Sequence, residues 1–508
     1  MRRIFKVVFL VTAFSIITRA LGFIFRIYLS RELGAVALGE YQIAMSVFGV
    51  VLTLISSGLP LIVSRSVASS RAKNNKKAES SIVSSGLIIS VILCILISVV
   101  VIFFPKFIER LFASANSASM LIILLPALIF SSPYTIFRGA MWGQKRFFAI
   151  SFTELFEQVV RMIICAILFA LPLSLSMPQR AGLSLSIACI FSGVLCTILY
   201  FTKNGKLSSP KNSFKHLLCS STPITSIRTA SSLVTSFIAL IIPLRLMASG
   251  ISKTEALAEF GIASGMTLPL IMIPCTLIGS LAVAMLPEIS AQTENIDKKP
   301  PASLSIIKKQ ISLCLSFSII IAMCLVPAYM SIGTSIGISL FSSLRAGKLL
   351  VISAWVLLPL GVSHITGCIL NAIGLETKSL INYIISAIFL IICILVLPAY
   401  IGIYSLVIGL GGMYTITAIT NLAMLSRRKL IDYAPLKTLT LLIVAILPIA
   451  LITKFLTGIL LTFLPCMFAT IIGGLVSIVC YGLFLMIFNI ADFNGFITKQ
   501  KKSRLLKV

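Results

Sequence analysis

Apolar residues dominate long stretches of this chain, and short polar segments separate one stretch from the next. Fourteen stretches have the length of about 20 residues that an α-helix needs to cross the hydrocarbon core of a bilayer. They lie at about 5–29, 40–63, 82–104, 119–141, 151–171, 182–201, 223–247, 262–286, 310–330, 349–371, 379–398, 402–425, 438–458 and 463–488. The pattern predicts an all-α polytopic membrane protein with about 14 transmembrane helices.

The composition leads to the same class. Of the 508 residues, 58% are hydrophobic and 11% are charged, and the mean hydropathy is +1.10. Soluble globular domains carry about twice that share of charged residues, so a soluble protein is excluded. The stretch 5–29 is too long for the apolar region of a cleaved signal peptide, and Arg19 interrupts it. We therefore expect this helix to remain in the mature protein.

Connecting segments that are rich in basic residues alternate along the chain with segments that are poor in them. The chain has 42 Lys and Arg against 14 Asp and Glu. With a cytoplasmic N-terminus, 28 of the basic residues lie in cytoplasmic segments and 8 in outer ones, which is the bias that orients membrane proteins. Both termini are thus predicted to be cytoplasmic. The basic tail 499–508 is expected to lie near anionic lipid headgroups, with a nucleic-acid or partner site as the alternative.

The twelve cysteines are scattered singly, nearly all within the apolar stretches. The sequence contains no CxxC pair and no group of histidines at the spacing of metal ligands. We therefore expect no disulfide framework, no metal site and no cofactor.

An internal repeat relates two parts of the chain. Residues 26–45 align without gaps to residues 245–264, an offset of 219, and seven of the twenty pairs are identical. The identical pairs are Arg26/Arg245, Ser30/Ser249, Ala37/Ala256, Leu38/Leu257, Glu40/Glu259, Ile43/Ile262 and Ala44/Ala263. Tyr41 aligns with Phe260, a conservative difference. The offset spans six predicted helices, so both copies enter the membrane in the same direction.

This repeat predicts the division of the chain. We expect two parallel six-helix bundles, 1–201 and 223–425, joined by a cytoplasmic linker over 202–222. Two further helices and the basic cytoplasmic tail follow in 426–508. A substrate path is expected between the two bundles.

Six arginines fall inside the predicted membrane spans. They are Arg19, Arg26, Arg138, Arg161, Arg228 and Arg245. Each charge at a span centre costs about 2.5–3.5 kcal/mol on insertion scales, so these side chains should face water or an opposite charge.

Two of these arginines share the first predicted helix. Arg19 and Arg26 are two turns apart and share one face, and Gly22 between them leaves that face open to a close neighbour. Arg19 is expected to line a cavity, with a buried Glu154 or Glu157 partner as the alternative. The repeat would bring Arg26 and Arg245 face to face across that cavity.

The acids of the fifth stretch lie beside one of these arginines. Glu157 and Arg161 are four residues apart with the acid first, and Glu154 lies one turn earlier on the same face. This spacing predicts a self-neutralising strip on one helix, with a role in binding a ligand or an ion as the alternative.

The remaining polar residues of the spans have expected roles that follow from their positions. Arg138 either extends to the cytoplasmic surface or binds a ligand, and Arg228 is expected to extend to that surface. Glu40 and Glu259 start their helices, where a carboxylate favourably meets the positive helix end. His364 is expected to be a packing residue, with proton transfer as the alternative.

The charges within the spans favour an anionic substrate. Arginines outnumber acids six to two there, and guanidinium groups bind phosphate in a bidentate way. An exporter of cations would instead need isolated carboxylates in its cavity. An enzyme is disfavoured because the outer loops are short and hold no histidine.

Three motifs resemble a known family. The segment TRALGFIFRIYLSRELGAVALGEYQIA, followed by SGLPLIVSRSVA and later by FEQVVR, resembles the stage V sporulation protein B group of polysaccharide and lipid-linked precursor exporters. This group is related to the MurJ lipid II flippases within the multidrug, oligosaccharidyl-lipid and polysaccharide (MOP) exporter superfamily. The resemblance covers essentially the whole chain.

The resemblance implies roles for particular residues. Arg19, Arg26 and Glu40 would correspond to cavity residues needed for flipping, and the last two helices would form a groove for a lipid tail. Thr53 stands where the relatives have an arginine, and 262–286 holds no basic residue. The implied substrate is therefore an undecaprenyl diphosphate-linked saccharide in general rather than lipid II in particular.

The predicted substrate-binding residues combine this resemblance with the charge pattern. They are Arg19, Arg26, Arg245, Glu40, Arg138, Glu157 and Arg161. The resemblance implies a transporter of the bacterial cytoplasmic membrane that moves a lipid-linked anionic saccharide, such as a peptidoglycan precursor for spore cortex, from the inner to the outer leaflet by alternating access. Partners would be this substrate, membrane lipid and enzymes of cell-wall synthesis, and not nucleic acid. Coupling by membrane potential, Na⁺ or H⁺ stays open, as do two other functions: a cation-coupled multidrug antiporter and a non-transporting scaffold for cell-wall synthesis.

Overall fold

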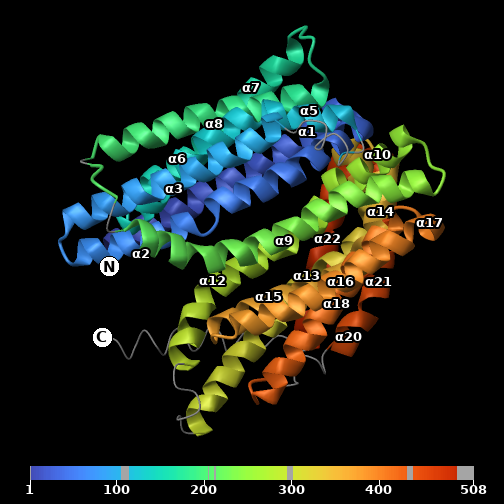
Figure 1. Cartoon of the computed structure of the whole chain (residues 1–508). Coiled ribbons are helices and arrows are strands. Elements are labelled where there is room, and N and C mark those ends of the chain that lie inside the picture. The colour runs from blue at the N-terminus through green and yellow to red at the C-terminus, as the bar shows by residue number, and fades with distance from the viewer. Residues whose placement is uncertain are drawn as a thin grey trace. The chain divides into compact units, whose positions relative to one another are not determined.

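The computed structural model describes the chain as a set of α-helices (Figure 1). Residues 2–103, 112, 114–203, 205–210, 213–293, 301–431 and 439–488 are described. The basic tail 499–508, for which we predicted a place near lipid headgroups, lies outside them. The described residues divide into two compact units, and each unit is treated by itself below.

Unit 1 comprises Met1–Gly265 and Pro398–Ile403. Its helices are α1 (Arg2–Ser56), α2 (Leu59–Ala72), α3 (Lys76–Phe103), α5 (Ala115–Ile123), α6 (Leu125–Gly143), α7 (Phe147–Ala170), α8 (Met177–Phe201), α9 (Phe214–Ala248), α10 (Lys253–Gly261) and α17 (Pro398–Ile401). Its core forms where α2, α3, α6 and α8 meet, around side chains such as Val63, Ile136 and Met141.

Unit 2 comprises Met266–Leu397 and Tyr404–Val508. A π-helix, η1 (Ile262–Thr267), crosses from the first unit into the second. The other helices are α11 (Leu268–Ile271), α12 (Ile273–Thr293), α13 (Pro301–Phe341), α14 (Leu344–Ser353), η3 (Ala354–Val356), α15 (Leu357–Ala372), α16 (Glu376–Val396), α18 (Tyr404–Arg427), α20 (Leu439–Val444), α21 (Ile446–Phe463) and α22 (Cys466–Ile487). The core of this unit gathers buried residues of α12, α13, α15 and α18, such as Ile311 and Ile369.

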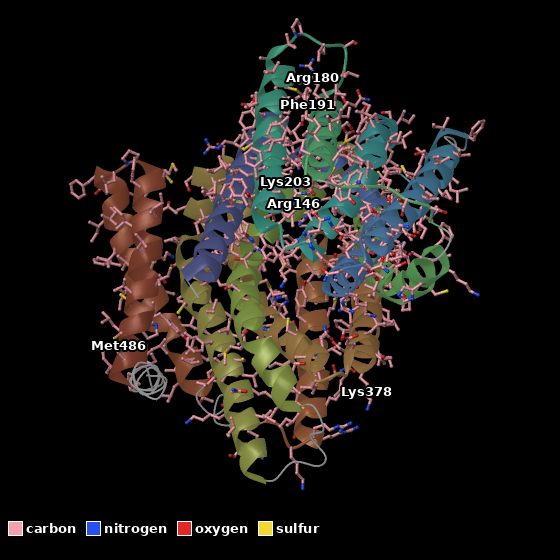
Figure 2. All side chains as sticks on the ribbon, turned by 90° about the vertical axis from the view of Figure 1, so that its left-hand side faces the viewer. Arg146, Arg180, Phe191, Lys203, Lys378 and Met486 are labelled. Atoms are coloured by element: carbon pink, nitrogen blue, oxygen red, sulfur yellow. The ribbon has the colours of Figure 1, made fainter. Side chains whose placement is uncertain are left out.

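Large apolar side chains cover much of the outer surface of these helices. Phe191 on α8 and Met486 on α22, labelled in Figure 2, are 52% and 62% exposed. Helices that are apolar on their outer faces as well as inside suit lipid rather than water. The prediction of an all-α polytopic membrane protein is confirmed.

The predicted number of spans is not confirmed. Within the described residues, 11 helices are long and apolar enough to cross a membrane, or 12 if the bent pair α5 and α6 counts as one span. Two causes explain the lower number. The first two predicted spans are counted together as Val11–Ala72 although a kink at Gly34 separates them, and α7 carries the three charges Glu154, Glu157 and Arg161.

Gly34 separates two helices within α1. Its backbone has φ 69° and ψ 177°, a conformation that is essentially restricted to glycine, and the helix kinks there. The predicted helices 5–29 and 40–63 are thus two arms of one kinked element. Gly22 was expected to admit a close neighbour, but a Cβ atom at this position would meet nothing within 4 Å.

The two copies of the internal repeat pack against each other within unit 1. A Cβ atom on Gly39 of α1 would lie 2.1 Å from the carbonyl oxygen of Leu257 on α10. Conversely, a Cβ atom on Gly261 would lie 2.1 Å from the carbonyl oxygen of Ala35. The two backbones therefore touch directly, and only glycine permits this approach. The related segments 26–45 and 245–264 meet at this contact.

The predicted division into two six-helix bundles stays a prediction. The second predicted bundle begins at 223, within α9, and α9 and α10 pack in unit 1. Unit 2 begins inside the π-helix, at Met266.

Candidate anion-binding site

Arg161 of α7 is held by two aromatic residues of α1. Its Nη2 atom donates a hydrogen bond of 2.6 Å to the Tyr41 hydroxyl oxygen. Its Cζ atom lies 4.9 Å from the centre of the Phe25 ring, in the geometry of a cation–π contact. Both aromatic side chains are buried. They lie on opposite arms of the kinked helix, so the kink at Gly34 contributes to the position of Arg161.

Arg26 lies in the same neighbourhood. It is close enough to Arg161 and Tyr41 for their charges to interact, and the two guanidinium groups repel each other. The Arg26 side chain is exposed, and within the described part of the chain it has no hydrogen-bond or ion-pair partner. Two neighbouring guanidinium groups that form no ion pair attract anions.

Arg138 of α6 pairs with Glu154 of α7. The pair joins Arg138 Nη2 to Glu154 Oε1, and about one third of each side chain is exposed. The charge of Arg138 is thus neutralised across two helices, and its extension to the cytoplasmic surface stays a prediction. The pairing also gives Glu154 a partner other than Arg19.

Glu157 lies among the same helices but does not pair as expected. It interacts electrostatically with Arg161 and Arg138, and the side chains of Tyr134 and Ser192 lie beside it. Among the described residues, Glu157 and Arg161 form no hydrogen bond or ion pair with each other. The predicted self-neutralising strip on α7 holds only in part: Glu154 pairs with Arg138 of α6, and Glu157 interacts with Arg161 without forming an ion pair.

The cluster carries a surplus of positive charge. Three guanidinium groups, of Arg26, Arg138 and Arg161, stand with two carboxylates, of Glu154 and Glu157. One of those carboxylates is already paired with Arg138. A bound anion would balance the surplus positive charge of such a cluster.

Glu40 is buried near the cluster on the second arm of α1. Its carboxylate accepts hydrogen bonds from the Ser114 hydroxyl and from the Asn116 amide, at 3.2 and 3.3 Å for the latter. The Ser117 hydroxyl donates to its backbone oxygen at 3.0 Å. The helix continues on both sides of Glu40, so the prediction that it caps a helix start is wrong. It fastens Ser114 and the first turn of α5 to α1.

Glu259 is likewise not a cap. Helix α10 begins at Lys253, and the hydroxyl of the preceding Ser252 accepts a hydrogen bond of 3.3 Å from the backbone N–H of Glu255. Glu259 lies in the second half of this helix. The sequence signal that could have located the start is the serine followed three residues later by an acid.

Two more predicted site residues, Arg19 and Arg245, are, like Glu40, not connected to the cluster by the described contacts. Arg19 is exposed on the first arm of α1, and no hydrogen bond or ion pair holds it within the described residues. Arg245 lies near the end of α9, half-buried, and its Nε atom is buried without a hydrogen-bond partner. That these two converge with Arg26 on one cavity stays a prediction.

Two further polar residues have positions of note. Arg228 Nη1 donates a hydrogen bond of 3.3 Å to the carbonyl oxygen of Ser57. His364 of α15 was expected to be a packing residue, but its side chain is exposed, and its Nε2 lies 3.8 Å from where a Cβ atom on Gly279 of α12 would be. A role for His364 in proton transfer stays a prediction.

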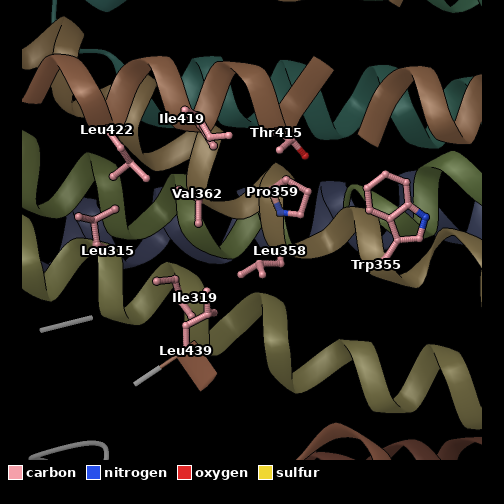
Figure 3. A pocket seen from close by; sticks show the side chains of 11 residues that line it. Leu315, Ile319, Trp355, Leu358, Pro359, Val362, Thr415, Ile419, Leu422 and Leu439 are labelled. Carbon is pink, nitrogen blue, oxygen red and sulfur yellow. The ribbon is translucent and has the colours of Figure 1, made fainter. Parts of the chain in front are cut away.

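An apolar groove lies in unit 2 (Figure 3). Its volume is about 340 Å³, and its lining is almost entirely apolar. The lining residues are Leu315, Ile319, Trp355, Leu358, Pro359, Val362, Thr415, Ala418, Ile419, Leu422 and Leu439. Leu439 begins α20 in the predicted helix 438–458, whereas the other residues come from α13, η3, α15 and α18. Most of this groove is thus formed by helices other than the last two.

Sequence reasoning missed Tyr41, Phe25 and Tyr134 as parts of the cluster. Tyr41 carried a signal, because it is the aromatic position at which the two repeat copies differ. The described residues include no group of three or more His, Cys, Asp or Glu side chains that could hold a metal ion.

Comparison with known proteins places the chain in a family. Residues 4–293 match the family described as polysaccharide biosynthesis protein. The chain belongs to this family. The family resemblance predicted from the three motifs is confirmed by this match and by similarity to stage V sporulation protein B of Bacillus subtilis (strain 168). The identity to that relative is 24% over 300 residues, which cover 56% of this chain and 57% of the relative.

Solved structures share the fold of this polysaccharide biosynthesis family member. A lipid II flippase MurJ in an inward closed conformation superposes with a TM-score of 0.69 and 17% identity, covering 94% of this chain and 98% of that one. An inward-facing multidrug resistance MATE family transporter of the MOP superfamily superposes with a TM-score of 0.68 and 15% identity, covering 83% of this chain and 96% of that one. At these identities the likeness concerns the fold.

Proposed function

We propose that this protein is a transporter that moves an undecaprenyl diphosphate-linked saccharide, such as a peptidoglycan precursor, from the inner to the outer leaflet of the bacterial cytoplasmic membrane by alternating access. Family membership and the fold shared with MurJ support a flippase of lipid-linked precursors. The two termini are then cytoplasmic, as the distribution of basic residues favours. Enzymes of cell-wall synthesis, for instance those of the spore cortex, would deliver or take up the substrate.

One observation carries the choice of substrate class. Arg26 and Arg161 are close enough to interact electrostatically, and neither forms an ion pair with a carboxylate in the described residues. A cavity that selects organic cations would need the reverse arrangement, with unpaired carboxylates. A diphosphate offers several oxygens that can accept hydrogen bonds from guanidinium groups, so it is the chemical partner that suits this pair.

The apolar groove of unit 2 supports a substrate with a long hydrocarbon chain. Its lining offers a surface for a prenyl tail and almost no hydrogen-bonding group for a polar ligand. Burial of apolar area contributes about 25 cal/mol per Å², so a chain that lies in such a groove is held without any specific polar contact.

The membrane potential would favour export. Movement of one elementary charge across the potential changes the free energy by about 2.3 kcal/mol per 100 mV. For an inside-negative cell, a dianionic headgroup that crosses the full field outward gains about 4–5 kcal/mol.

The test is a headgroup-accessibility assay in proteoliposomes that contain a labelled undecaprenyl diphosphate-linked saccharide. The wild-type protein should move the headgroup between leaflets, and Arg26→Gln should abolish this movement while membrane insertion is retained. Lys378→Gln serves as the matched control, because Lys378 is an exposed basic residue at the start of α16, outside the cluster (Figure 2). Uptake of organic cations by the same vesicles without any movement of the saccharide would refute the proposal.

A further inference from the structure

Arg161 is fixed in place but has hydrogen-bond donors that the described contacts do not use. A guanidinium group has five N–H donors, and the described contacts of Arg161 are one hydrogen bond to Tyr41 and the face contact with Phe25. Its Nε atom is buried and has no hydrogen-bond partner in the described part of the molecule. A buried donor without an acceptor is costly, so the arrangement is complete only when an acceptor is bound.

We propose that Arg26 and Arg161 bind the diphosphate of the substrate as a pair, and that Tyr41 is the positioning residue that holds Arg161 for this purpose. The inference rests on the proposed function and specifies which side chains contact the headgroup. It replaces the pair that the sequence alone suggested, in which Arg19 and Arg26 act together.

Electrostatics favour Arg161 over Arg19 as the partner of Arg26, because Arg161 is the arginine that acts on Arg26 in the described residues. Arg19 and Arg26 are seven residues apart on one helix, which separates their backbones by about 10 Å along the axis. Arg161 reaches across from α7 and is close enough to Arg26 for the two charges to repel each other. The adjacent phosphate groups of a single diphosphate would relieve that repulsion, because one anion then lies between two cations.

The hydroxyl of Tyr41 has a specific purpose in this arrangement. The aligned residue of the second repeat copy is Phe260, which is as deeply buried as Tyr41. A plain aromatic ring therefore satisfies the packing at this position of the repeat. The additional hydroxyl of the first copy is a buried polar group that needs a partner, and its partner is Arg161.

The experiment is a double-mutant cycle on binding. The four proteins are the wild type, Tyr41→Phe, Arg161→Gln and the double variant, and the control is Tyr28→Phe. Tyr28 lies on the same helix α1, where its ring stacks on Phe169 at 6.0 Å. For each protein, inorganic pyrophosphate competes with a fluorescent undecaprenyl diphosphate-linked disaccharide in detergent micelles, and initial translocation rates are measured in proteoliposomes.

Tyr41→Phe should weaken the binding of pyrophosphate about tenfold, since hydrogen bonds to charged groups contribute that much to an equilibrium constant. Tyr41 acts through Arg161, so the double variant should bind as weakly as Arg161→Gln alone. Tyr28→Phe should bind as the wild type does. Arg161→Lys, which keeps the charge but loses the planar fork, should lie between the wild type and Arg161→Gln.

Several results would overturn the inference while the proposed function stands. Equal affinity of Tyr41→Phe and the wild type, or additive losses in the double variant, would reject Tyr41 as a positioning residue. Wild-type affinity of Arg161→Gln, with affinity lost in Arg19→Gln, would reject the pair itself. Absence of any translocation by the wild-type protein would instead reject the proposed function.

Discussion

Replacing a glycine of α1 by alanine should change the stability of the protein in opposite directions at different positions. The reason is that only some of these glycines contact the second repeat copy. Gly39 of α1 faces the carbonyl oxygen of Leu257, and a Cβ atom placed there would lie 2.1 Å from it. Gly49, on the same arm of α1, would gain a Cβ atom with nothing within 4 Å. Gly34 also has open space, but its φ of 69° disfavours any side chain.

The magnitudes follow from these three environments. Gly49→Ala should stabilise the protein by about 0.5–1 kcal/mol, because alanine is the better helix former. Gly34→Ala should cost about 1–3 kcal/mol from backbone strain. Gly39→Ala must push two backbones apart by more than about 1 Å to restore ordinary contact, so it should cost about 3 kcal/mol, the upper end of the range for overpacking.

The assay is unfolding of the purified protein in mixed micelles of rising denaturing-detergent content, followed by far-ultraviolet circular dichroism. The midpoints should fall in the order Gly49→Ala, wild type, Gly34→Ala, Gly39→Ala, from most to least stable. Gly261→Ala, the reciprocal change on α10, should resemble Gly39→Ala. If Gly39→Ala unfolds at the same midpoint as Gly49→Ala, the direct contact between the repeat copies is refuted.

Two more outcomes are expected. Asn421→Ala should destabilise unit 2 by about 2–4 kcal/mol in the same unfolding assay. The Asn421 amide accepts a hydrogen bond of 2.9 Å from Asn382 and donates one of 3.2 Å to Thr366, and all three side chains are buried. An unchanged midpoint would contradict this network. Arg180→Gln should raise hydrogen exchange over residues 171–176, because the Arg180 guanidinium donates to the carbonyl oxygens of that turn; equal exchange in variant and wild type would contradict its role.

Much of the fold was predictable from the lengths of the apolar stretches alone, and the errors in the predicted spans have local causes. A helix covers most of each of the fourteen apolar stretches, because a span needs a run of apolar residues that periodicity reveals. Gly34 marks the kink between the first two predicted spans, but a glycine in a polar segment does not by itself distinguish a sharp kink from an open turn. The three charges of α7 also complicate the count of membrane spans, because composition does not distinguish a charge that faces a cavity from one that faces bulk water.

The candidate site was predictable in its residue types but not in its pairings. Arg26, Arg138, Arg161 and Glu157 all occur in the cluster, since charges within a span must find polar surroundings. The spacing of Glu157 and Arg161 favoured a pair on one helix, but a neighbouring helix offered Arg161 the hydroxyl of Tyr41. Spacing along one helix carries no information on what an adjacent helix presents, so such pairings require the structure.

The most direct test of the central claim, that guanidinium groups recognise a diphosphate headgroup, is a comparison of two substrates in the same proteoliposomes. Both carry the same labelled disaccharide and the same undecaprenyl chain, joined by a diphosphate in one and by an uncharged ether in the other. The account predicts that the wild-type protein moves only the diphosphate-linked compound between leaflets. Equal rates for the two compounds would contradict it, because a transporter that ignores the charge has no need of Arg26 and Arg161.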